Sequence, residues 1–322
     1  MFARMDPLSD VLRAVRLTGA YFYRVEAAAP WSVQTQPARA LVPRLLPEAE
    51  HLIAYHILTA GACWAGVIDE PQVAMEPGDV ILFPQGDAHV LSSEAGRRLP
   101  GDAVDGAPQR YPNTCYLGAG MRRDTAFVCG FLGCDVRPFN PLLAALPRRL
   151  HLRALAERGW LAEFPRQVVA ESQHGDVGSD TMLTRMAELM FVECLRRYVG
   201  QLAPGQAGWL AGLADPLVGA ALAALHGRPT DPWSLGELAR AVASSRTVLA
   251  ERFARLVGVP PMQYLTQWRL QLATEELAGG SATVATVAAR VGYESETAFS
   301  RAFKRATGQS PAAWRRARHR AT

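Results

Sequence analysis

The chain has 322 residues, with 34 Lys or Arg against 30 Asp or Glu and an odd count of five cysteines. This length suits two domains and a linker. No stretch approaches the 18 or more apolar residues of a membrane helix, and the N-terminal MFARMDPLSDVLRAV lacks the apolar centre of a signal peptide. We therefore expect a cytoplasmic protein without membrane contact and, in a reducing compartment, without a disulfide framework.

The N-terminal half predicts one short helix followed by many short strands. Residues 6–17 have helical apolar spacing. Alternating apolar residues and turn residues then predict strands near 21–25 and over 51–58, 63–68, 73–75, 80–83, 89–92, 114–117 and 125–132. Regularly spaced strands with Gly and Pro turns favour a β-sandwich or a barrel. Residues 92–113 are rich in Gly, Pro and Arg and predict a long loop.

One spacing among these strands is specific. Gly78, Pro84, Gly86 and His89 stand in the order G-x5-P-x-G-x2-H. This order resembles the second sequence motif of the cupin barrel, and the resemblance covers about residues 20–135. It implies a cupin-like β-barrel that senses an effector, and we assign it to residues 1–175.

A metal site in this barrel is not expected. Metal-binding cupins carry His-x-His…Glu in their first motif, whereas His51 and His56 are too far apart for that pair and no Glu lies between them and Gly61. His89 together with His56 or His51 stays open as a metal-binding combination. The alternative is that these are hydrogen-bonded structural histidines.

Two kinds of signal are compatible with such a barrel. A small molecule in the barrel mouth would contact aromatic and imidazole side chains, and the candidates are Tyr21, Tyr23, Trp31, His56, Trp64 and His89. A redox signal would act on thiols, and the candidates are Cys115, Cys129 and Cys134. Arg122 and Arg123 are close to them in the sequence and would favour thiolate. The third interpretation is that these cysteines are buried apolar residues.

Helices follow the last predicted strand. Helical spacing is found over 139–146, 160–171 and 181–199, and the last of these is strongly amphipathic. We interpret residues 176–212 as a helical linker. A further helix is predicted from Asp215, which caps it, to Gly227.

The most informative pattern is a repeat near the C-terminus. With a shift of fifty residues, 235–261 aligns with 285–311 without a gap. The capping, apolar and terminating residues of the second helix repeat as Ser245, Leu249, Phe253 and Gly258 and as Ser295, Phe299, Phe303 and Gly308. This predicts two helix-turn-helix modules, over about 235–258 and 285–308, joined by a helix over 262–278.

The positive charge is concentrated in the repeated segment. Residues 231–322 hold thirteen Lys or Arg and seven Asp or Glu, a net charge of +6, so the rest of the chain carries −2 of the total +4. An excess of this kind is the electrostatic requirement for binding phosphates. The second helix of each copy combines an apolar side with an outward side of Thr and Arg, which suits a major groove.

The C-terminal hundred residues resemble the DNA-binding domain of the AraC/XylS family of bacterial transcription regulators. The resemblance is carried by LGELA (235–239), the S-x3-L-x3-F pattern of Ser245, YL…WRLQLA (264–273) and VAARVGYESETAFSRAFKRATGQSP (287–311). It implies that both recognition helices enter the major groove. Carried over by position, the base-facing candidates are Arg246, Thr247, Ala250, Glu251, Glu296, Thr297, Ser300 and Arg301, with Arg255 and Lys304 expected at phosphates.

Two further expectations depend on this resemblance. It implies that the helix over 181–199 forms a dimer interface, which makes residues 176–212 a linker and dimerisation segment. Glu251 departs from the cation that is common at its position, and this departure leaves the base preference of the first module open. Glu251 could accept a hydrogen bond from cytosine N4 or pair with a neighbouring Arg.

The sequence thus predicts an α+β multidomain protein: a cupin-like β-barrel (1–175), a helical linker (176–212) and an all-α domain with two helix-turn-helix modules (213–322). The predicted function is sequence-specific transcription regulation. Expected partners are double-stranded DNA, RNA polymerase, a small-molecule effector and a second copy of the chain, with no certain cofactor. The alternatives are a metal-dependent cupin enzyme with an accessory helical domain, for which no complete metal triad is legible, and a nucleoid-type binder without sequence preference.

Overall fold

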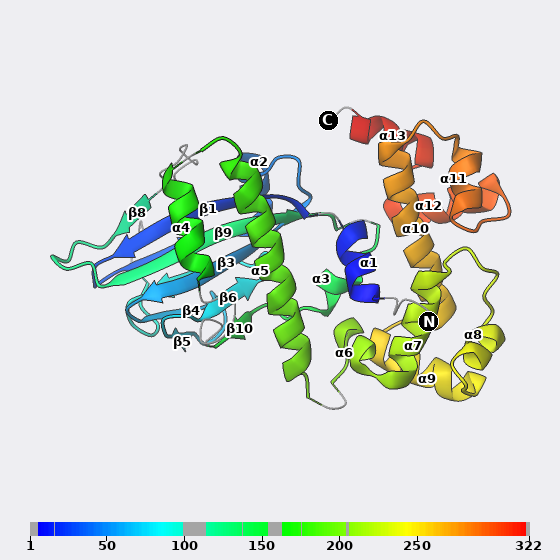
Figure 1. The fold of residues 1–322 in the computed structure, drawn as a ribbon, viewed down its shortest axis with the longest axis horizontal. Coiled ribbons are helices and arrows are strands. Elements are labelled where there is room, and N and C mark those ends of the chain that lie inside the picture. The colour runs from blue at the N-terminus through cyan, green and yellow to red at the C-terminus, as the bar shows by residue number, and fades with distance from the viewer. Residues whose placement is uncertain are drawn as a thin grey trace. The chain divides into compact units, whose positions relative to one another are not determined.

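The structure is a computed structural model of the chain, and it describes residues 6–15, 17–98, 114–136, 138–153, 163–174, 176–203 and 206–319. The chain folds into two compact units (Figure 1). The sheet unit consists of 17–135 and 146–200, and the helical unit consists of 1–16, 136–145 and 201–322. Most of the predicted loop, residues 99–113, lies outside the described part of the chain. No described helix combines the length and apolarity needed to cross a membrane.

The strands of the sheet unit form two separate sheets. The six-stranded sheet has the order β10-β6-β3-β9-β1-β8 and the four-stranded sheet the order β2-β7-β4-β5. The strands are β1 (Leu17–Ala27), β2 (Ser32–Thr35), β3 (His51–Ala60), β4 (Cys63–Val67), β5 (Val73–Met75), β6 (Val80–Phe83), β7 (His89–Ser92), β8 (Thr114–Leu117), β9 (Thr125–Cys134) and β10 (Leu150–Leu152). Because no strand pairing joins the two sheets among the described residues, the predicted closed barrel is corrected to two open sheets.

Most of the strands were predicted from the sequence, but three described elements of the sheet unit were not. The strands β2 and β10 and the helix α2 (Ala38–Leu45) have weak local signals. The helix α2 begins after Pro37, which provides no side-chain cap, and it contains Pro43. Because a proline inside a helix removes one backbone hydrogen bond, packing rather than local preference stabilises this helix.

The second glycine of the cupin-type motif, Gly86, is required by close packing. Gly86 has φ 69°, and a Cβ atom at this position would lie 2.5 Å from the Cβ atom of Ala38 and 2.8 Å from Cε1 of His51. The ring of His51 also contacts the same turn, with Nε2 2.7 Å from the carbonyl oxygen of Pro84. The motif therefore fixes the turn between β6 and β7 against α2 and the start of β3.

Two helices lie over the outer face of the six-stranded sheet (Figure 1). They are α4 (Phe164–His174) and α5 (Ser179–Gln201). The sequence predicted α5 within two residues at each end, whereas the predicted start of α4 near residue 160 lies outside the described residues. One side of α5 is buried, and on its other side Met182 and Leu189 are 54% and 58% exposed.

The helical unit collects segments from three parts of the chain. It contains α1 (Pro7–Ala14), α3 (Pro141–Ala145), α6 (Trp209–Ala214), α7 (Pro216–Gly227), α8 (Leu235–Ala241), α9 (Arg246–Val257), α10 (Pro261–Gly279), α11 (Val284–Arg290), α12 (Glu296–Thr307) and α13 (Pro311–His319). Two features differ from the predicted domain limits. Residues 1–16 and 136–145 belong to this unit, and α6 occupies part of the predicted linker, with Trp209 buried.

Candidate nucleic-acid interface

The first helix-turn-helix module consists of α8 and α9, and polar caps define both helices. The Ser234 hydroxyl accepts a hydrogen bond from the backbone N–H of Glu237 at 3.2 Å, and the Glu237 carboxylate accepts one from the N–H of Ser234 at 2.7 Å. At the start of α9, the Ser245 hydroxyl accepts a hydrogen bond from the N–H of Val248 at 3.2 Å. The helix ends at Gly258, which has φ 87°. These caps satisfy backbone groups that a helix end leaves without partners.

The second module consists of α11 and α12 and has the same design. Thr283 caps α11 by accepting a hydrogen bond from the N–H of Thr286, and Ser295 caps α12 by accepting one from the N–H of Ala298. The helix α12 ends at Gly308, which has φ 77°. A left-handed glycine after the last helical turn is a common way to end a helix, because glycine has no Cβ penalty there.

The structure corrects the gapless alignment of the two copies. The recognition helices α9 and α12 match with a shift of 50 residues, but α8 and α11 match with a shift of 49. The backbone hydrogen bonds that close the turns confirm this: the N–H of Ser244 binds the carbonyl of Ala239, and the N–H of Tyr293 binds that of Ala288, both at 2.9 Å. The second turn therefore contains one residue more than the first.

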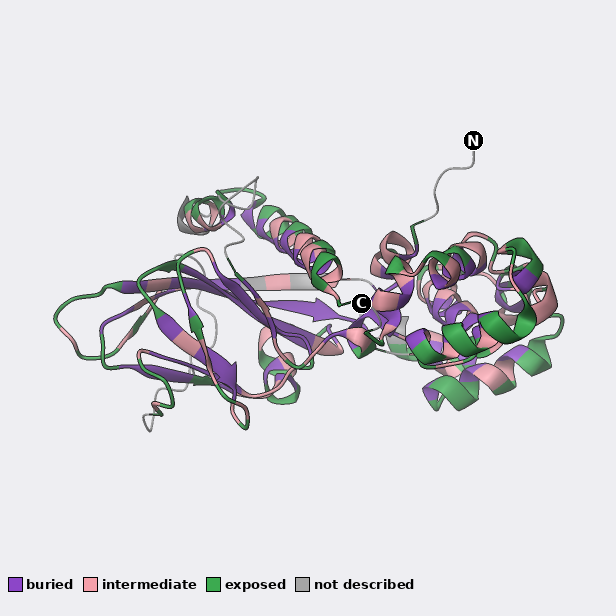
Figure 2. Cartoon of the chain, turned by 90° about the horizontal axis from the view of Figure 1, so that it is seen from below, coloured by how far each residue is buried: buried purple, intermediate pink, exposed green. Residues whose placement is uncertain are grey.

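Each recognition helix buries an apolar stripe. Through this stripe α9 contacts α10, and α12 contacts α13. On α9 the buried residues are Leu249, Phe253 and Leu256. On α12, Phe299 and Phe303 are fully buried. Phe253 makes an edge contact with Tyr264 of α10, and Phe303 makes one with Trp314 of α13. Burial of these stripes leaves the opposite side of each recognition helix in solvent. Figure 2 shows helices of this unit with buried and exposed sides.

A buried polar cluster fixes the first half of α10 within the unit. The Trp209 indole N–H donates to the Tyr264 hydroxyl at 2.8 Å, and Nε2 of His226 lies 2.8 Å from the same hydroxyl. On its other side, Nδ1 of His226 lies 3.6 Å from the carboxylate of Asp10 on α1. The neighbouring imidazole lowers the pKa of Asp10, whereas burial lowers the pKa of His226 and raises that of Tyr264.

The second half of α10 is joined to two distant segments by one side chain. Gln271 is 2% exposed, and its amide group donates to the carbonyl oxygen of Ala14 at 2.8 Å. Its amide oxygen accepts from the N–H of Phe139 at 3.1 Å. The segments around α1 and α3 therefore belong to the support of the helix that joins the two modules.

The structure exposes most of the residues that the sequence predicted to contact DNA. Ala250 and Ser300 are half-buried, and the exposed ones are Arg246, Thr247, Glu251, Arg255, Glu296, Thr297, Arg301 and Lys304. Among the described residues, none of the cations Arg246, Arg255, Arg301 and Lys304 has an acidic partner. These four charges are therefore available to a polyanion.

Two exposed residues of α9 are not among the predicted DNA contacts. Arg252 is exposed, but its guanidinium binds one carboxylate oxygen of Asp215 at 2.9 Å and 2.6 Å. The same Asp215 side chain caps α7, so Arg252 fastens α9 to the end of α7. Val248, the second of these residues, is 51% exposed although it is apolar. Its helical position beside the outward residues was the available signal.

The candidate effector residues of the sheet unit are mostly packed in its interior. Tyr23, Trp31, His56 and His89 are buried, and Trp64 is half-buried. Of Tyr21 the structure describes the backbone, which pairs with Phe131. A separate cavity of about 660 Å³ is lined by Arg24, Leu58, Thr59, Pro77, Gly78, Glu163, Pro165, Arg166, Val169 and Ala170, and thus by none of these candidates.

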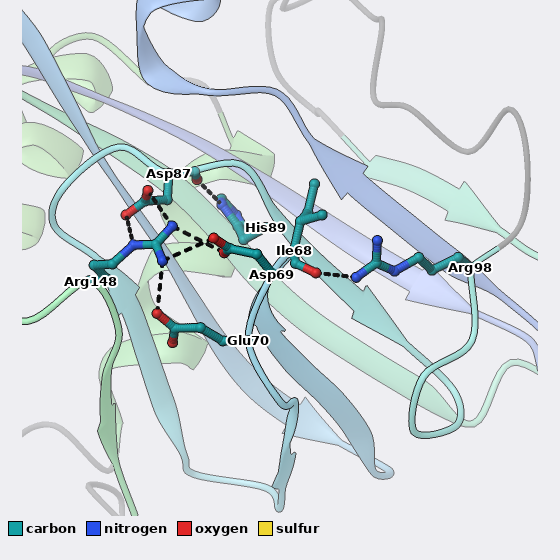
Figure 3. Close-up of polar contacts among 7 residues, drawn as sticks. All are labelled: Ile68, Asp69, Glu70, Asp87, His89, Arg98 and Arg148. Carbon is teal, nitrogen blue, oxygen red and sulfur yellow. Dashed lines mark hydrogen bonds and ion pairs between the residues drawn. The ribbon is translucent and has the colours of Figure 1, made fainter.

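A chain of hydrogen bonds links the two buried histidines to a thiol. Nδ1 of His89 donates to the carbonyl oxygen of Asp87 at 3.0 Å, an atom that can only accept (Figure 3). Nε2 of His89 therefore accepts the proton of His56 Nε2 at 2.8 Å, which leaves Nδ1 of His56 to accept from the thiol of Cys129 at 2.7 Å. Burial lowers the pKa of His56 and brings that of His89 to about 4, so both rings are neutral.

This arrangement uses the histidines as structural links. The third histidine, His51, contacts the carbonyl oxygen of Pro84, and no group of three or more His, Cys, Asp or Glu side chains in the described ranges is placed to hold a metal ion. Beside the turn, Arg148 binds Asp69, Glu70 and Asp87 at 2.8–3.1 Å, so these carboxylates also have a partner (Figure 3).

The candidate redox cysteines do not have the environment of reactive thiols. Burial raises the pKa of Cys115, of Cys129 and of Cys134, the last to about 12. The guanidinium of Arg123 lies 4.0 Å from the ring centre of Tyr116, and no shift toward thiolate accompanies it. Because the thiolate is the reactive form, burial disfavours the form of these side chains that would react.

Comparison with known proteins agrees with the two-unit organisation. Residues 6–200 match the family described as Cupin, and residues 238–317 match the family described as Helix-turn-helix domain. A Streptomyces lividans protein named as an AraC-like transcription regulator is 32% identical to the chain, and the alignment covers 97% of this chain and 98% of that protein. The transcriptional regulator AlkR of Acinetobacter baylyi is 30% identical to the chain, and the alignment covers 97% of this chain and 99% of that protein.

Two further similarities are more distant or shorter. The RCS-specific transcriptional activator RclR of Escherichia coli is 28% identical, over 82% of this chain and 84% of that protein. The DNA-binding domain of AdpA, solved in complex with a target DNA, is 34% identical and covers 33% of this chain and 96% of that chain, with a TM-score of 0.32.

A sheet-rich unit with a cupin match and a basic unit with two capped helix-turn-helix modules define a DNA-binding regulator. The chain belongs to the AraC-like transcription regulators and binds double-stranded DNA. The alternative of a metal-dependent cupin enzyme is wrong, because relatives that match nearly the full length of the chain are transcription regulators.

Proposed function

We propose that the chain regulates transcription at a specific promoter site by placing α9 and α12 in the major groove. The observation that carries this proposal is the pair of capped helices whose outward sides hold the unpaired cations Arg246, Arg255, Arg301 and Lys304. In this proposal the base edges are read by Arg246, Thr247, Ala250, Glu251, Glu296, Thr297, Ser300 and Arg301. Arg255 and Lys304 bind phosphates, which position the protein without reading sequence.

The sheet unit controls this activity by responding to a signal. The cavity of about 660 Å³ has the size of a small-molecule site, and apolar residues such as Leu58 and Val169 line it together with polar residues such as Arg24 and Arg166. This cavity is a better supported effector site than the buried candidates Tyr23, Trp31, His56 and His89, which would have to separate to admit a ligand. Tyr21 and Trp64 stay candidates for such an opened site.

A redox signal is the second candidate. It is favoured by the contact between Cys129 and His56 and by the similarity to a regulator named RCS-specific. Under this alternative, Cys115, Cys129 or Cys134 is oxidised after the unit opens. Replacing each of these by Ser and measuring promoter response to oxidants and to candidate ligands separates the two signals, since only the redox signal depends on these thiols.

The active form is a homodimer that acts in the cytoplasm and contacts RNA polymerase. The surface proposed for dimerisation is the exposed side of α5, where Met182 and Leu189 are separated by two helical turns. Light scattering at micromolar concentration tests this directly: the wild-type chain is expected to be a dimer, and Leu189→Glu is expected to be a monomer with unchanged secondary structure.

The function itself is tested by selection of bound duplexes from a random pool, followed by protection mapping on the enriched site. The expected result is one recurring sequence with two half-sites about one helical turn apart. Base substitutions in it should each cost about 1–3 kcal/mol. Binding without any recurring sequence would instead support the nucleoid-type binder and exclude the proposal.

A further inference from the structure

The apolar residue on the outward side of α9 remains to be explained. Val248 is 51% exposed, whereas the other large apolar residues of α9 are buried in the stripe or half-buried. Within residues 206–319, it is the one large apolar side chain in the exposed class. A single exposed valine needs no explanation by itself, so its position and neighbours decide what it does.

The position of Val248 is on the side of α9 that faces away from the core. Val248, Glu251 and Arg255 are spaced i, i+3, i+7 and therefore lie along one side of the helix. Its exposed neighbours also include Thr247 and, one turn on, Arg252, whose guanidinium is bound to Asp215. Thr247 and Val248 belong to the first turn, where recognition helices meet base edges. The surface around Val248 thus carries charged groups, Glu251 and the Arg252–Asp215 pair one turn away and the unpaired cation Arg255 two turns away. A base edge beside phosphates suits such a surface better than an apolar protein partner does.

The geometry of this side chain is fixed before any ligand binds. The N–H of Val248 donates to the Ser245 hydroxyl at 3.2 Å, which locks the first turn of α9. A β-branched side chain inside a helix has one strongly preferred rotamer, so the two methyl groups of Val248 point in a defined direction. Contact with a ligand therefore costs little conformational entropy.

We propose that Val248 reads the C5-methyl group of a thymine, and that it thereby sets one base of the site bound by the first module. In the major groove the thymine methyl is the apolar group that distinguishes bases, and apolar side chains are its usual partners. This inference rests on the proposed function, since it needs α9 to lie in the major groove. In the second module the matching position, fifty residues on, is Ala298, whose shorter side chain reaches less far.

The test removes the methyl group from the DNA without changing its hydrogen bonds. Each thymine in the selected site is replaced in turn by deoxyuridine, and dissociation constants are measured by fluorescence anisotropy at one salt concentration. For the wild-type chain, one thymine in the half-site of the first module is expected to lose about fourfold in affinity, the value for burying one methyl-sized group. Val248→Ala is expected to bind the thymine duplex several-fold more weakly and to be insensitive to deoxyuridine at that position.

The two changes together form a double-mutant cycle, and their non-additivity measures the contact. Thymines of the second half-site serve as the matched control and should keep their sensitivity in Val248→Ala. The thermal midpoint and the salt dependence of Val248→Ala should equal those of the wild type, because the side chain is exposed and binds no phosphate. Val248→Thr keeps one methyl group and should keep part of the discrimination.

Two outcomes overturn the inference in distinguishable ways. If a specific site is found but no thymine is sensitive, or if Val248→Ala keeps the wild-type sensitivity, Val248 does not read a methyl group although the proposed function stands. If the selection yields no recurring site, the proposed function fails, and this inference fails with it.

Discussion

The two helix-turn-helix modules are copies in sequence that differ at the turn. In the first module the turn passes through Ala243, which has φ 52°, and the corresponding residue of the second module is Gly292, with φ 82°. Left-handed backbone costs a non-glycine residue roughly 1 kcal/mol. The second turn also contains one more residue. The comparison shows that a repeat can keep its helices and its caps while the connection between them diverges.

The outward sides of the modules differ in charge. At the shift of fifty residues, Arg246 corresponds to Glu296 and Glu251 corresponds to Arg301. On α9, Arg252 is bound to Asp215, whereas Ala302 stands at its place in α12. The second module therefore offers more free positive charge, and we expect it to contribute more to phosphate attraction than the first.

The largest expected effect is on stability, and it tests the packing of the apolar core in each module. Phe253→Ala and Phe303→Ala each remove a fully buried ring and should lower the free energy of unfolding by about 3–5 kcal/mol. Denaturant unfolding followed by circular dichroism measures this change. Thr297→Ala on the exposed side of α12 is the control and should stay within about 0.5 kcal/mol. Equal stability of Phe303→Ala and the control would show that the second module is not packed as described.

The charge comparison is sharpened by two variants of the second recognition helix. Arg301→Ala should weaken specific DNA binding by about 1–3 kcal/mol and relax the preference at one base pair. Lys304→Ala should weaken binding to all sequences and reduce the salt slope by about one. Anisotropy titrations over a range of salt concentrations separate these effects. A uniform loss with Arg301→Ala would place this side chain at a phosphate instead.

The next prediction concerns the helix α10, which joins the two modules. Gln271→Leu removes the partners of the Ala14 carbonyl and the Phe139 N–H, so we expect a loss of about 1–3 kcal/mol in unfolding free energy. Gln263→Leu on the exposed side of α10 is a matched control. A truncated chain that starts at residue 206 lacks both partner segments. In that chain Gln271→Leu should leave the free energy of unfolding unchanged. If Gln271→Leu destabilised the truncated chain by the same amount, the described contacts would not be its cause.

The smallest effects concern the turn itself. Ala243→Gly removes the strain of a left-handed non-glycine residue, but glycine also increases the conformational entropy of the unfolded chain. We expect the net effect to be an increase of about 0.5 kcal/mol in the free energy of unfolding. Gly292→Ala should act in the opposite direction by about 1 kcal/mol or more, since a Cβ there would also lie 3.0 Å from the Arg269 guanidinium and from Cα of Thr230. Thermal unfolding of both variants gives the signs, and a stabilised Gly292→Ala would contradict the described turn.

Local chemistry explains why so much of the helical unit was predictable. Capping residues such as Ser245 and Ser295, the left-handed glycines after α9 and α12, and the 3.6-residue apolar stripes act within a few positions of the chain. The same is true of the outward residues, which follow once the buried stripe is known. The sequence also indicated most strands of the sheet unit, because alternation and turn residues are local signals.

What the sequence alone determined was therefore the class of protein, the positions of the recognition helices and most of the residues on their outward sides. Only the tertiary structure decided that the sheets stay open, that Cys129, His56 and His89 form a buried chain, and that Gln271 joins α1 and the segment before α3 to α10. The physical reason is the distance along the chain over which each interaction acts. Caps and periodicity are set by neighbours in the chain, whereas strand pairing and buried hydrogen bonds join residues that are up to 257 positions apart.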